Sequence, residues 1–201
     1  AGEISTLHEN FLKMDFTGSN LSDQVRLIQK IYEERVTHLT DKPYVVDKLL
    51  LNFYWVGFIK RAFPGCKIIH VQRNPVDVCF SAYQNLFVEG ALSFTYDQED
   101  IITFYQKYEE MMAYWSQSLG DNIFQVCYED LVSNPAAEAK KIFNFIGIQY
   151  EDHFIEIDRN IKSVQTASDI QLRKPINKNS IARWKKYEPY ISPILKAFPS
   201  N

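Results

Sequence analysis

The chain has 201 residues, of which 46% are hydrophobic and 23% charged, and its formal net charge is −3. These values predict one soluble domain over residues 1–201 with a single sizeable core, and we expect no nucleic-acid partner. No stretch reaches the roughly 18 consecutive apolar residues that span a membrane, and no signal-peptide pattern is present. We therefore expect a cytoplasmic protein without a membrane partner.

Helical and extended patterns alternate along the chain, without repeats or low-complexity tracts. Apolar residues spaced three or four apart predict the longer helices, and Gly120 should end the longest. In order, we expect a helix over 21–39 capped around Ser22, a strand at 45–46, a helix over 49–62, a strand over 67–73, helices over 75–88 and 99–118, a strand over 123–128, and a helix from Asn134-Pro135 to Gly147. This alternation predicts an α/β fold with parallel strands.

The segment 67–83, KIIHVQRNPVDVCFSAY, carries the strongest local signal. Its apolar strand ends in Arg73, and Asn74-Pro75 is a strong helix start, because Asn caps well and Pro suits the first helical position. Asp77, three residues after the cap, is expected to complete a short acidic capping box. The sequence thus predicts a strand, a tight corner and a helix.

Arg73 and Ser81 should face the same corner. Ser81 lies four residues after Asp77, on the same helix face. Carboxyl ends of strands bind ligands in α/β sheets, and helix starts attract anions, so we predict a phosphate site formed by Arg73 and Ser81. In the alternative interpretation, Arg73 pairs with Asp77 and Ser81 bonds its own helix backbone.

The charge is unevenly distributed. Residues 159–187 contain eight basic side chains and one acidic side chain, Asp169, so this segment carries +7 and the remainder −10. The segment is rich in Ser, Thr, Asn and Gln and has little periodicity up to Trp184. We predict a basic loop that closes over a nucleotide, anchored near Arg183-Trp184; the alternative is a solvated basic face.

Cysteines and histidines show no metal-site spacing. The cysteines Cys66, Cys79 and Cys127 are far apart and include no CxxC pair, which argues against a disulfide framework or a zinc site. His70 lies inside an apolar strand and is interpreted as a packed core residue. We expect no metal and a reducing compartment.

Four blocks in order resemble PAPS-dependent sulfotransferases, which use 3′-phosphoadenosine 5′-phosphosulfate. They are VDKLLLNF at 46–53, R-N-P-x-D-x-x-x-S-x-Y at 73–83, VCYEDLV at 126–132, and TASDIQLRKPINKNSIARWKKY at 166–187. Leu50 stands where this family commonly has proline. The chain is most similar to bacterial sulfotransferases that resemble tyrosylprotein sulfotransferases. The resemblance implies a P-loop nucleotide-kinase-like fold, three-layer α/β/α with a mainly parallel sheet.

The resemblance also implies site roles. Arg73 and Ser81 would bind the 3′-phosphate, and Lys48, expected at the carboxyl end of a strand, would offset charge on the leaving phosphate. Glu3, in an A-G-E start like that of the family, would be the base for the acceptor hydroxyl, with His8 as second choice. The other implied cofactor contacts are Tyr128, Ser163, Thr166, Ser168 and Lys174.

In this family a Gly/Ser/Thr-rich loop of the form P-R-S-G-T-T precedes the glutamate and holds the 5′-phosphosulfate. No such segment is present in the 201 residues. We therefore expect a family member that lacks its first strand and this loop. Such a chain should catalyse little by itself, because the loop's backbone N–H groups are absent, and it could self-associate through exposed strand edges.

The sequence therefore predicts transfer of a sulfuryl group from PAPS to a hydroxyl acceptor, with release of 3′-phosphoadenosine 5′-phosphate (PAP). The acceptor could be a small molecule, a glycan or a peptide. The alternative is a non-catalytic PAP-binding or scaffold domain. A nucleotide kinase is disfavoured, because no G-x-x-x-x-G-K-[ST] loop is present.

Overall fold

The computed structural model describes residues 5–18, 20–87, 92–156 and 176–199. The chain divides into two compact units, residues 1–68 with 157–175, and residues 69–156 with 176–201. Each unit is described below by itself. Among the described helices, none combines the length and the apolar character that a membrane crossing requires.

The first unit is helical. It contains α1 (Thr6–Phe11), α2 (Leu21–Leu39), the 3₁₀-helix η1 (Leu50–Trp55) and α3 (Val56–Ala62). Its core joins one face of α1 to α2 and α3 and consists of Leu7, Phe11, Met14, Val25, Ile28, Ile59 and Ala62. Phe11 stacks on Trp55 with ring centroids 5.4 Å apart, so η1 is held against α1 by aromatic contact.

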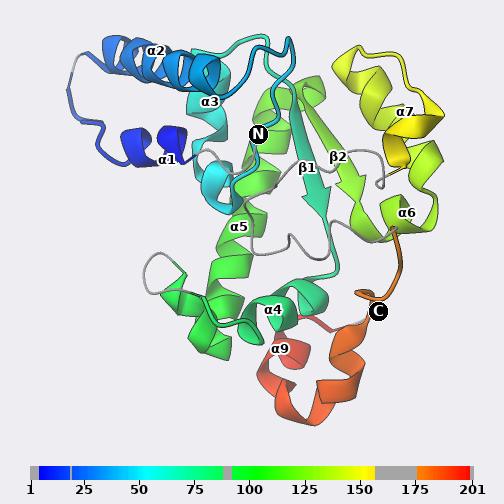
Figure 1. Ribbon diagram of the computed structural model, residues 1–201. Helices are drawn as coiled ribbons and strands as arrows, with labels where there is room; N and C mark the ends of the chain where they lie inside the picture. Colours follow the sequence, from blue (N-terminus) through cyan, green and yellow to red (C-terminus); the bar gives the residue numbers. More distant parts are fainter. Residues whose placement is uncertain (1–4, 19, 88–91, 157–175, 200–201) are drawn as a thin grey trace. The chain divides into compact units, whose positions relative to one another are not determined.

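The second unit contains the sheet. Its strands β1 (Ile68–Gln72) and β2 (Ile123–Cys127) are neighbours in a two-stranded sheet of the described residues, and both arrows point the same way in Figure 1. The other elements are α4 (Pro75–Tyr83), η2 (Ser93–Tyr96), α5 (Gln98–Leu119), η3 (Gly120–Asn122), α6 (Tyr128–Ser133), α7 (Pro135–Ile146), η4 (Asp152–Ile155), η6 (Arg183–Tyr190) and α9 (Ser192–Ala197).

The core of the second unit lies between α4, α5 and the C-terminal helices (Figure 1). Its buried residues are Val76, Cys79, Phe80, Ile101, Ile102, Tyr105, Trp184, Ile191 and Ile194. Segments about a hundred residues apart in sequence therefore share one core. This packing holds α4, and the corner that precedes it, in a fixed place relative to η6.

Most long elements match the sequence predictions. Helix α2 has the predicted bounds, α5 extends the predicted 99–118 by one residue at each end, and α7 begins at the predicted Asn134-Pro135. Gly120 and Gly147 end helices with positive φ angles of 49° and 75°, which favour glycine. The predicted interpretation of His70 is also confirmed: the residue is 9% exposed and its Nε2 is hydrogen-bonded to the Tyr108 hydroxyl.

Other local predictions are wrong. Residues 45–46 lie in an irregular stretch, and Val46 is 73% exposed, so two apolar residues did not suffice to form a strand. The first half of the predicted helix 49–62 is 3₁₀. Helix α4 ends at Tyr83 rather than at 88. Just beyond this end, the Asn85 side chain donates to the Ser81 carbonyl at 2.6 Å. The N-cap of α2 is Asn20 rather than Ser22.

Candidate functional site

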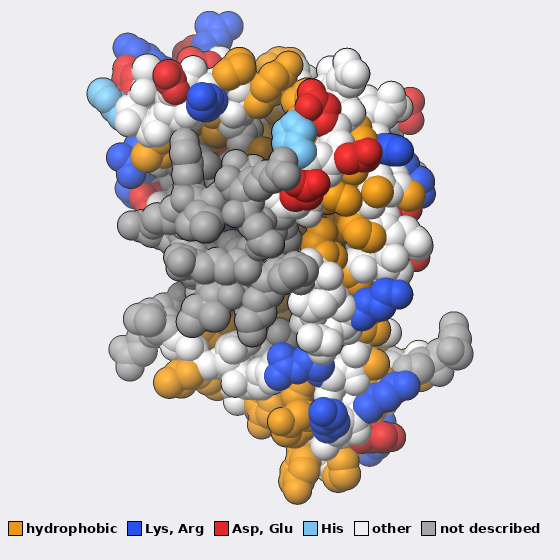
Figure 2. Space-filling model, turned by 45° about the vertical axis from the view of Figure 1, so that its right-hand side comes forward, with side chains coloured by type: hydrophobic (Ala, Val, Ile, Leu, Met, Phe, Trp, Pro, Cys, Tyr) orange, Lys and Arg blue, Asp and Glu red, His pale blue; other side chains and the backbone are white. Residues whose placement is uncertain are grey.

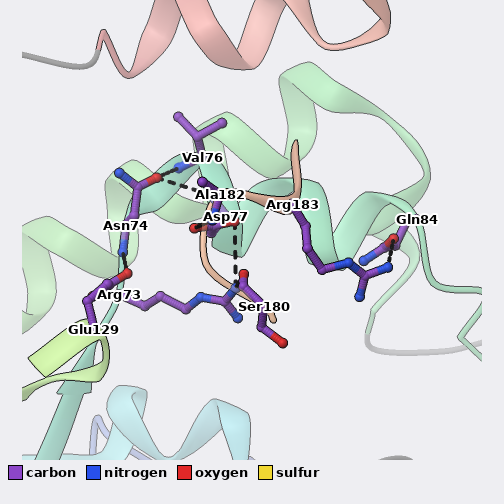
Figure 3. Close-up of polar contacts among 9 residues, drawn as sticks. All are labelled: Arg73, Asn74, Val76, Asp77, Gln84, Glu129, Ser180, Ala182 and Arg183. Atoms are coloured by element: carbon purple, nitrogen blue, oxygen red, sulfur yellow. Dashed lines mark hydrogen bonds and ion pairs between the residues drawn. The ribbon is translucent and has the colours of Figure 1, made fainter. Parts of the chain in front are cut away.

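The corner between β1 and α4 forms as the sequence predicts. Asn74 is the N-cap of α4, and its side-chain oxygen accepts hydrogen bonds from the N–H groups of Val76 at 3.0 Å and Asp77 at 3.2 Å (Figure 3). Pro75 occupies the first helical position. The cap fixes the turn directly after Arg73, so the Arg73 side chain leaves the carboxyl end of the strand at a defined point.

The predicted capping box is wrong in one partner. The Asn74 N–H donates to Oε1 of Glu129 at 3.0 Å, not to Asp77. The other oxygen of Glu129 accepts from the Cys127 thiol at 3.2 Å. Burial raises the pKa of Glu129, but hydrogen bonds from Asn74, from its own N–H and from Cys127, with the nearby Arg73 charge, outweigh this and lower the pKa below its usual value. The Glu129 carboxylate on α6 thus accepts the backbone hydrogen bond at the start of α4.

Asp77 points instead toward the C-terminal segment. Its side chain is 2% exposed, and Oδ2 accepts from the Ala182 N–H at 2.8 Å. Its Oδ1 lies 3.6 Å from Nη2 of Arg73. The alternative prediction of an Arg73–Asp77 ion pair is therefore confirmed.

Arg73 makes further contacts at this corner. Its Nη2 donates to the Ser180 carbonyl, and its guanidinium lies 4.7 Å from the centroid of the Tyr128 ring. Its Nε is buried and has no hydrogen-bond partner among the described residues, although its side chain is 21% exposed as a whole. The guanidinium thus lies over an aromatic face with an Nε that has no partner in the described part of the chain, which suits a phosphate oxygen.

Two other predicted site residues of the second unit are Tyr128, which meets Arg73 at this corner, and Ser81, which lies on α4. Tyr128 begins α6 rather than ending the strand, because β2 stops at Cys127. Ser81 is half-buried on α4, and its hydroxyl has no hydrogen-bond partner among the residues that the structure describes. The described contacts therefore do not include the alternative prediction, a hydrogen bond from the Ser81 hydroxyl to the backbone of its own helix. The structure brings Arg73 and Tyr128 together directly.

The first unit contains the other predicted residues that are described. Lys48 is exposed and lies in the irregular stretch before η1, so its predicted place at the end of a strand is wrong. His8 accepts a hydrogen bond at Nδ1 from the Trp55 indole N–H at 2.8 Å. A neutral imidazole with Nδ1 as acceptor keeps its proton on Nε2. His8 therefore has no free ring lone pair in this arrangement, which argues against it as the second-choice base.

Several predicted residues lie outside the described part of the chain. They are Glu3, Ser163, Thr166, Ser168 and Lys174. Of the basic segment 159–187, the described part has exposed side chains at Lys178, Arg183, Lys185 and Lys186, and a buried Trp184. Trp184 packs in the core of the second unit, and most of the loop that Arg183 and Trp184 are predicted to anchor lies outside the described residues. Figure 2 shows Lys and Arg side chains spread over several parts of the face that it draws.

The sequence analysis missed two parts of the corner. Glu129 directly follows Tyr128 at the carboxyl end of a strand, and this position could have indicated that its carboxylate lies at the corner. The Ser180–Ala182 turn contributes only backbone groups, a carbonyl to Arg73 and an N–H to Asp77. Every residue type has the same backbone groups, so the sequence offered no signal for this contact.

Comparison with known proteins bears on the family. The model described as "Sulfotransferase family" matches residues 12–152, which include Lys48, Arg73, Ser81 and Tyr128. The chain belongs to the sulfotransferase family. Within the described residues, no group of three or more His, Cys, Asp or Glu side chains is arranged to hold a metal ion.

Sulfotransferase relatives come from several organisms. An uncharacterized protein of Aquifex aeolicus is 33% identical over 82% of this chain and 22% of its own length. Protein-tyrosine sulfotransferase A of Caenorhabditis elegans is 26% identical over 77% of this chain and 42% of its own. Sulfotransferase 1E1 of Bos taurus is 25% identical over 57% of this chain and 39% of its own. The chain therefore spans less than half the length of these relatives.

The sulfotransferase fold is also found in a solved structure. The sulfotransferase domain from the curacin biosynthetic pathway matches with a TM-score of 0.62 and 16% identity, over 97% of this chain and 86% of that one. At this identity the match shows the fold alone. It confirms the predicted α/β fold of the P-loop-like type.

Proposed function

We propose that this sulfotransferase-family chain transfers a sulfuryl group from PAPS to a hydroxyl acceptor and releases PAP. The observation that carries the proposal is the Arg73 guanidinium at the carboxyl end of β1, which lies beside the Tyr128 ring and whose Nε has no partner among the described residues. A charged donor left without a partner at such a strand end suits an anionic ligand. Arg73 would bind the 3′-phosphate there, assisted by the Ser81 hydroxyl.

The remaining roles follow from the chemistry of the transfer. A bond forms between the acceptor oxygen and sulfur while the bond from sulfur to the bridging oxygen of the 5′-phosphate breaks. Negative charge grows on the departing phosphate, which Lys48 would offset. The acceptor hydroxyl must lose its proton, and Glu3 would take it. Ser163, Thr166, Ser168 and Lys174 would contact the nucleotide from the basic segment.

The acceptor can be a protein or a small compound that carries a hydroxyl group. Relatives of the chain are named protein-tyrosine sulfotransferase A, flavonol sulfotransferase-like and cytosolic sulfotransferase 15. Tyrosine and flavonols, which the first two names mention, both carry phenolic hydroxyl groups. We therefore propose a hydroxyl-bearing small molecule, glycan or peptide as the acceptor, and a cytoplasmic location.

The test separates the 3′-phosphate from the rest of the nucleotide. Isothermal titration calorimetry would compare PAP with 5′-AMP, which lacks only the 3′-phosphate. For the unchanged chain we expect PAP to bind more tightly. Arg73→Ala should weaken PAP by about 2–4 kcal/mol, the range for removing one partner of a hydrogen-bonded charge pair, and should leave 5′-AMP nearly unchanged. Arg73→Lys should recover only part of the loss, because it keeps the charge but not the planar donor pair.

A matched control is Arg35→Ala, which removes one positive charge from the exposed surface of α2. It should leave both affinities unchanged. Equal loss of PAP and 5′-AMP binding in Arg73→Ala would contradict the assignment of the 3′-phosphate to Arg73. The transfer reaction is tested with this sequence joined to a preceding strand and a P-R-S-G-T-T loop of the family type. If PAP binds as expected but this longer chain transfers no labelled sulfate from PAPS to any acceptor in a panel of phenols, sugars and tyrosine peptides, the transfer reaction itself is refuted.

A further inference from the structure

Asp77 is an unusual residue to find in its surroundings. Its carboxylate is 2% exposed, on a helix whose neighbouring residues Val76, Cys79 and Phe80 belong to the apolar core. Burial of a carboxylate is unfavourable unless charges and hydrogen bonds compensate for it. The corner's capping does not require this carboxylate, because Glu129 holds the Asn74 N–H. Asp77 therefore needs another explanation.

Two side chains hold one short turn at both of its ends. Arg73 donates to the Ser180 carbonyl, and Asp77 accepts from the Ala182 N–H at 2.8 Å (Figure 3). The same two side chains lie 3.6 Å apart. Arg73, Asp77 and the 180–182 turn thus form a closed ring of polar contacts.

The turn has a backbone shape that its own sequence does not favour. Ala182 has φ 55° and ψ 28°, the single positive φ at a non-glycine residue in the described chain. A left-handed alanine is unfavourable, so other contacts must hold it. On one side these contacts come from Trp184, which is buried in the core, and from the Lys185 N–H, which donates to the Ala182 carbonyl at 3.2 Å. On the other side the contact is the Asp77 carboxylate.

We propose that Asp77 is a positioning residue for recognition of the 3′-phosphate. By accepting from the Ala182 N–H it holds the 180–182 turn, and the Ser180 carbonyl of that turn orients the Arg73 guanidinium. In this orientation Nη2 is engaged by the protein and Nε remains as the donor for the ligand. The inference rests on the proposed function, because it takes Arg73 as the residue that binds the phosphate.

The test uses two substitutions at Asp77 that differ in one property. Asp77→Asn keeps an oxygen that can accept from Ala182, whereas Asp77→Ala removes it. We expect Asp77→Asn to keep the ratio of PAP affinity to 5′-AMP affinity within about threefold of the unchanged chain. Asp77→Ala should reduce that ratio roughly ten- to hundredfold, as expected for loss of a hydrogen bond to a charged group. Asp121→Ala, which removes an exposed carboxylate in the same unit, should change nothing.

Hydrogen exchange provides a readout that does not need a ligand. The Ala182 amide should exchange slowly in the unchanged chain and in Asp77→Asn, and rapidly in Asp77→Ala. Should Asp77→Ala fail to fold, Ala182→Pro addresses the same contact from the other side. Proline has no N–H to donate and cannot adopt a φ of 55°, so this variant should also reduce the affinity ratio.

The outcomes separate the two proposals. If the unchanged chain does not prefer PAP over 5′-AMP, the proposed function fails and the Ala182 exchange result still reports on the turn. A normal affinity ratio in Asp77→Ala or in Ala182→Pro would overturn the positioning role. So would an equal loss in Asp77→Asn and Asp77→Ala with Ala182 still protected in Asp77→Asn, because the carboxylate charge would then act on Arg73 without the turn.

Discussion

Trp184 should be the main anchor of the C-terminal segment, and its replacement by alanine tests this directly. The side chain is 9% exposed and packs in the core with residues from α4, α5 and α9. A tryptophan buries about 150–250 Å², which at ~25 cal/mol per Å² amounts to roughly 4–6 kcal/mol as an upper estimate. Large-to-small changes of buried aromatic residues measure about 3–5 kcal/mol. We expect Trp184→Ala to lower the free energy of unfolding by about 4 kcal/mol.

The measurement is urea unfolding followed by circular dichroism. Tyr190→Ala is the matched control, because Tyr190 belongs to the same 3₁₀-helix and is 75% exposed. It should change the unfolding free energy by less than about 0.5 kcal/mol. The Trp184 variant should also bind PAP more weakly, because the 180–182 turn lies directly before it. A loss below about 1 kcal/mol for Trp184→Ala would refute the view that this tryptophan holds η6 in the core.

Two further predictions concern stability. Burial lowers the pKa of His70 below its ordinary value of 6.5, so the folded state favours the neutral ring. The contribution of His70 to the free energy of unfolding should be complete above pH 6.5 and decline as the pH falls below it, with a slope of at most about 1.4 kcal/mol per pH unit. Urea unfolding across pH 4.5–8 (roughly the range in which histidine titrates) should show that the unfolding free energy depends less on pH in His70→Gln. The same pH dependence in both chains would contradict this prediction. Asn74→Ala removes the cap of α4 and should lower the free energy of unfolding by about 1 kcal/mol, whereas Asn74→Asp should retain most of the stability that the cap provides. Thermal unfolding measures this, and equal stability of the unchanged chain and both variants would show that the cap contributes nothing.

Local patterns in the sequence were sufficient for the long elements and for the corner. Helices α2 and α5 follow from apolar periodicity, and α7 follows from Asn134-Pro135 at its start. The ends of α5 and α7 follow from glycines with positive φ. The start of α4 follows from Asn74-Pro75. These signals act between residues a few positions apart, so a sequence displays them directly. They also placed Arg73 at the carboxyl end of a strand.

Tertiary structure decided which groups meet at that corner. The sequence predicted that Asp77 would return to the Asn74 N–H, but Glu129 takes this donor and Asp77 accepts from Ala182, 105 positions away. Likewise, Arg73 meets a backbone carbonyl of Ser180 that is 107 positions away. A carboxylate has the same local propensity whichever of several donors it accepts from. Only the shared core of α4 and η6 brings the Ala182 N–H within reach, and this long-range packing therefore selects the partner.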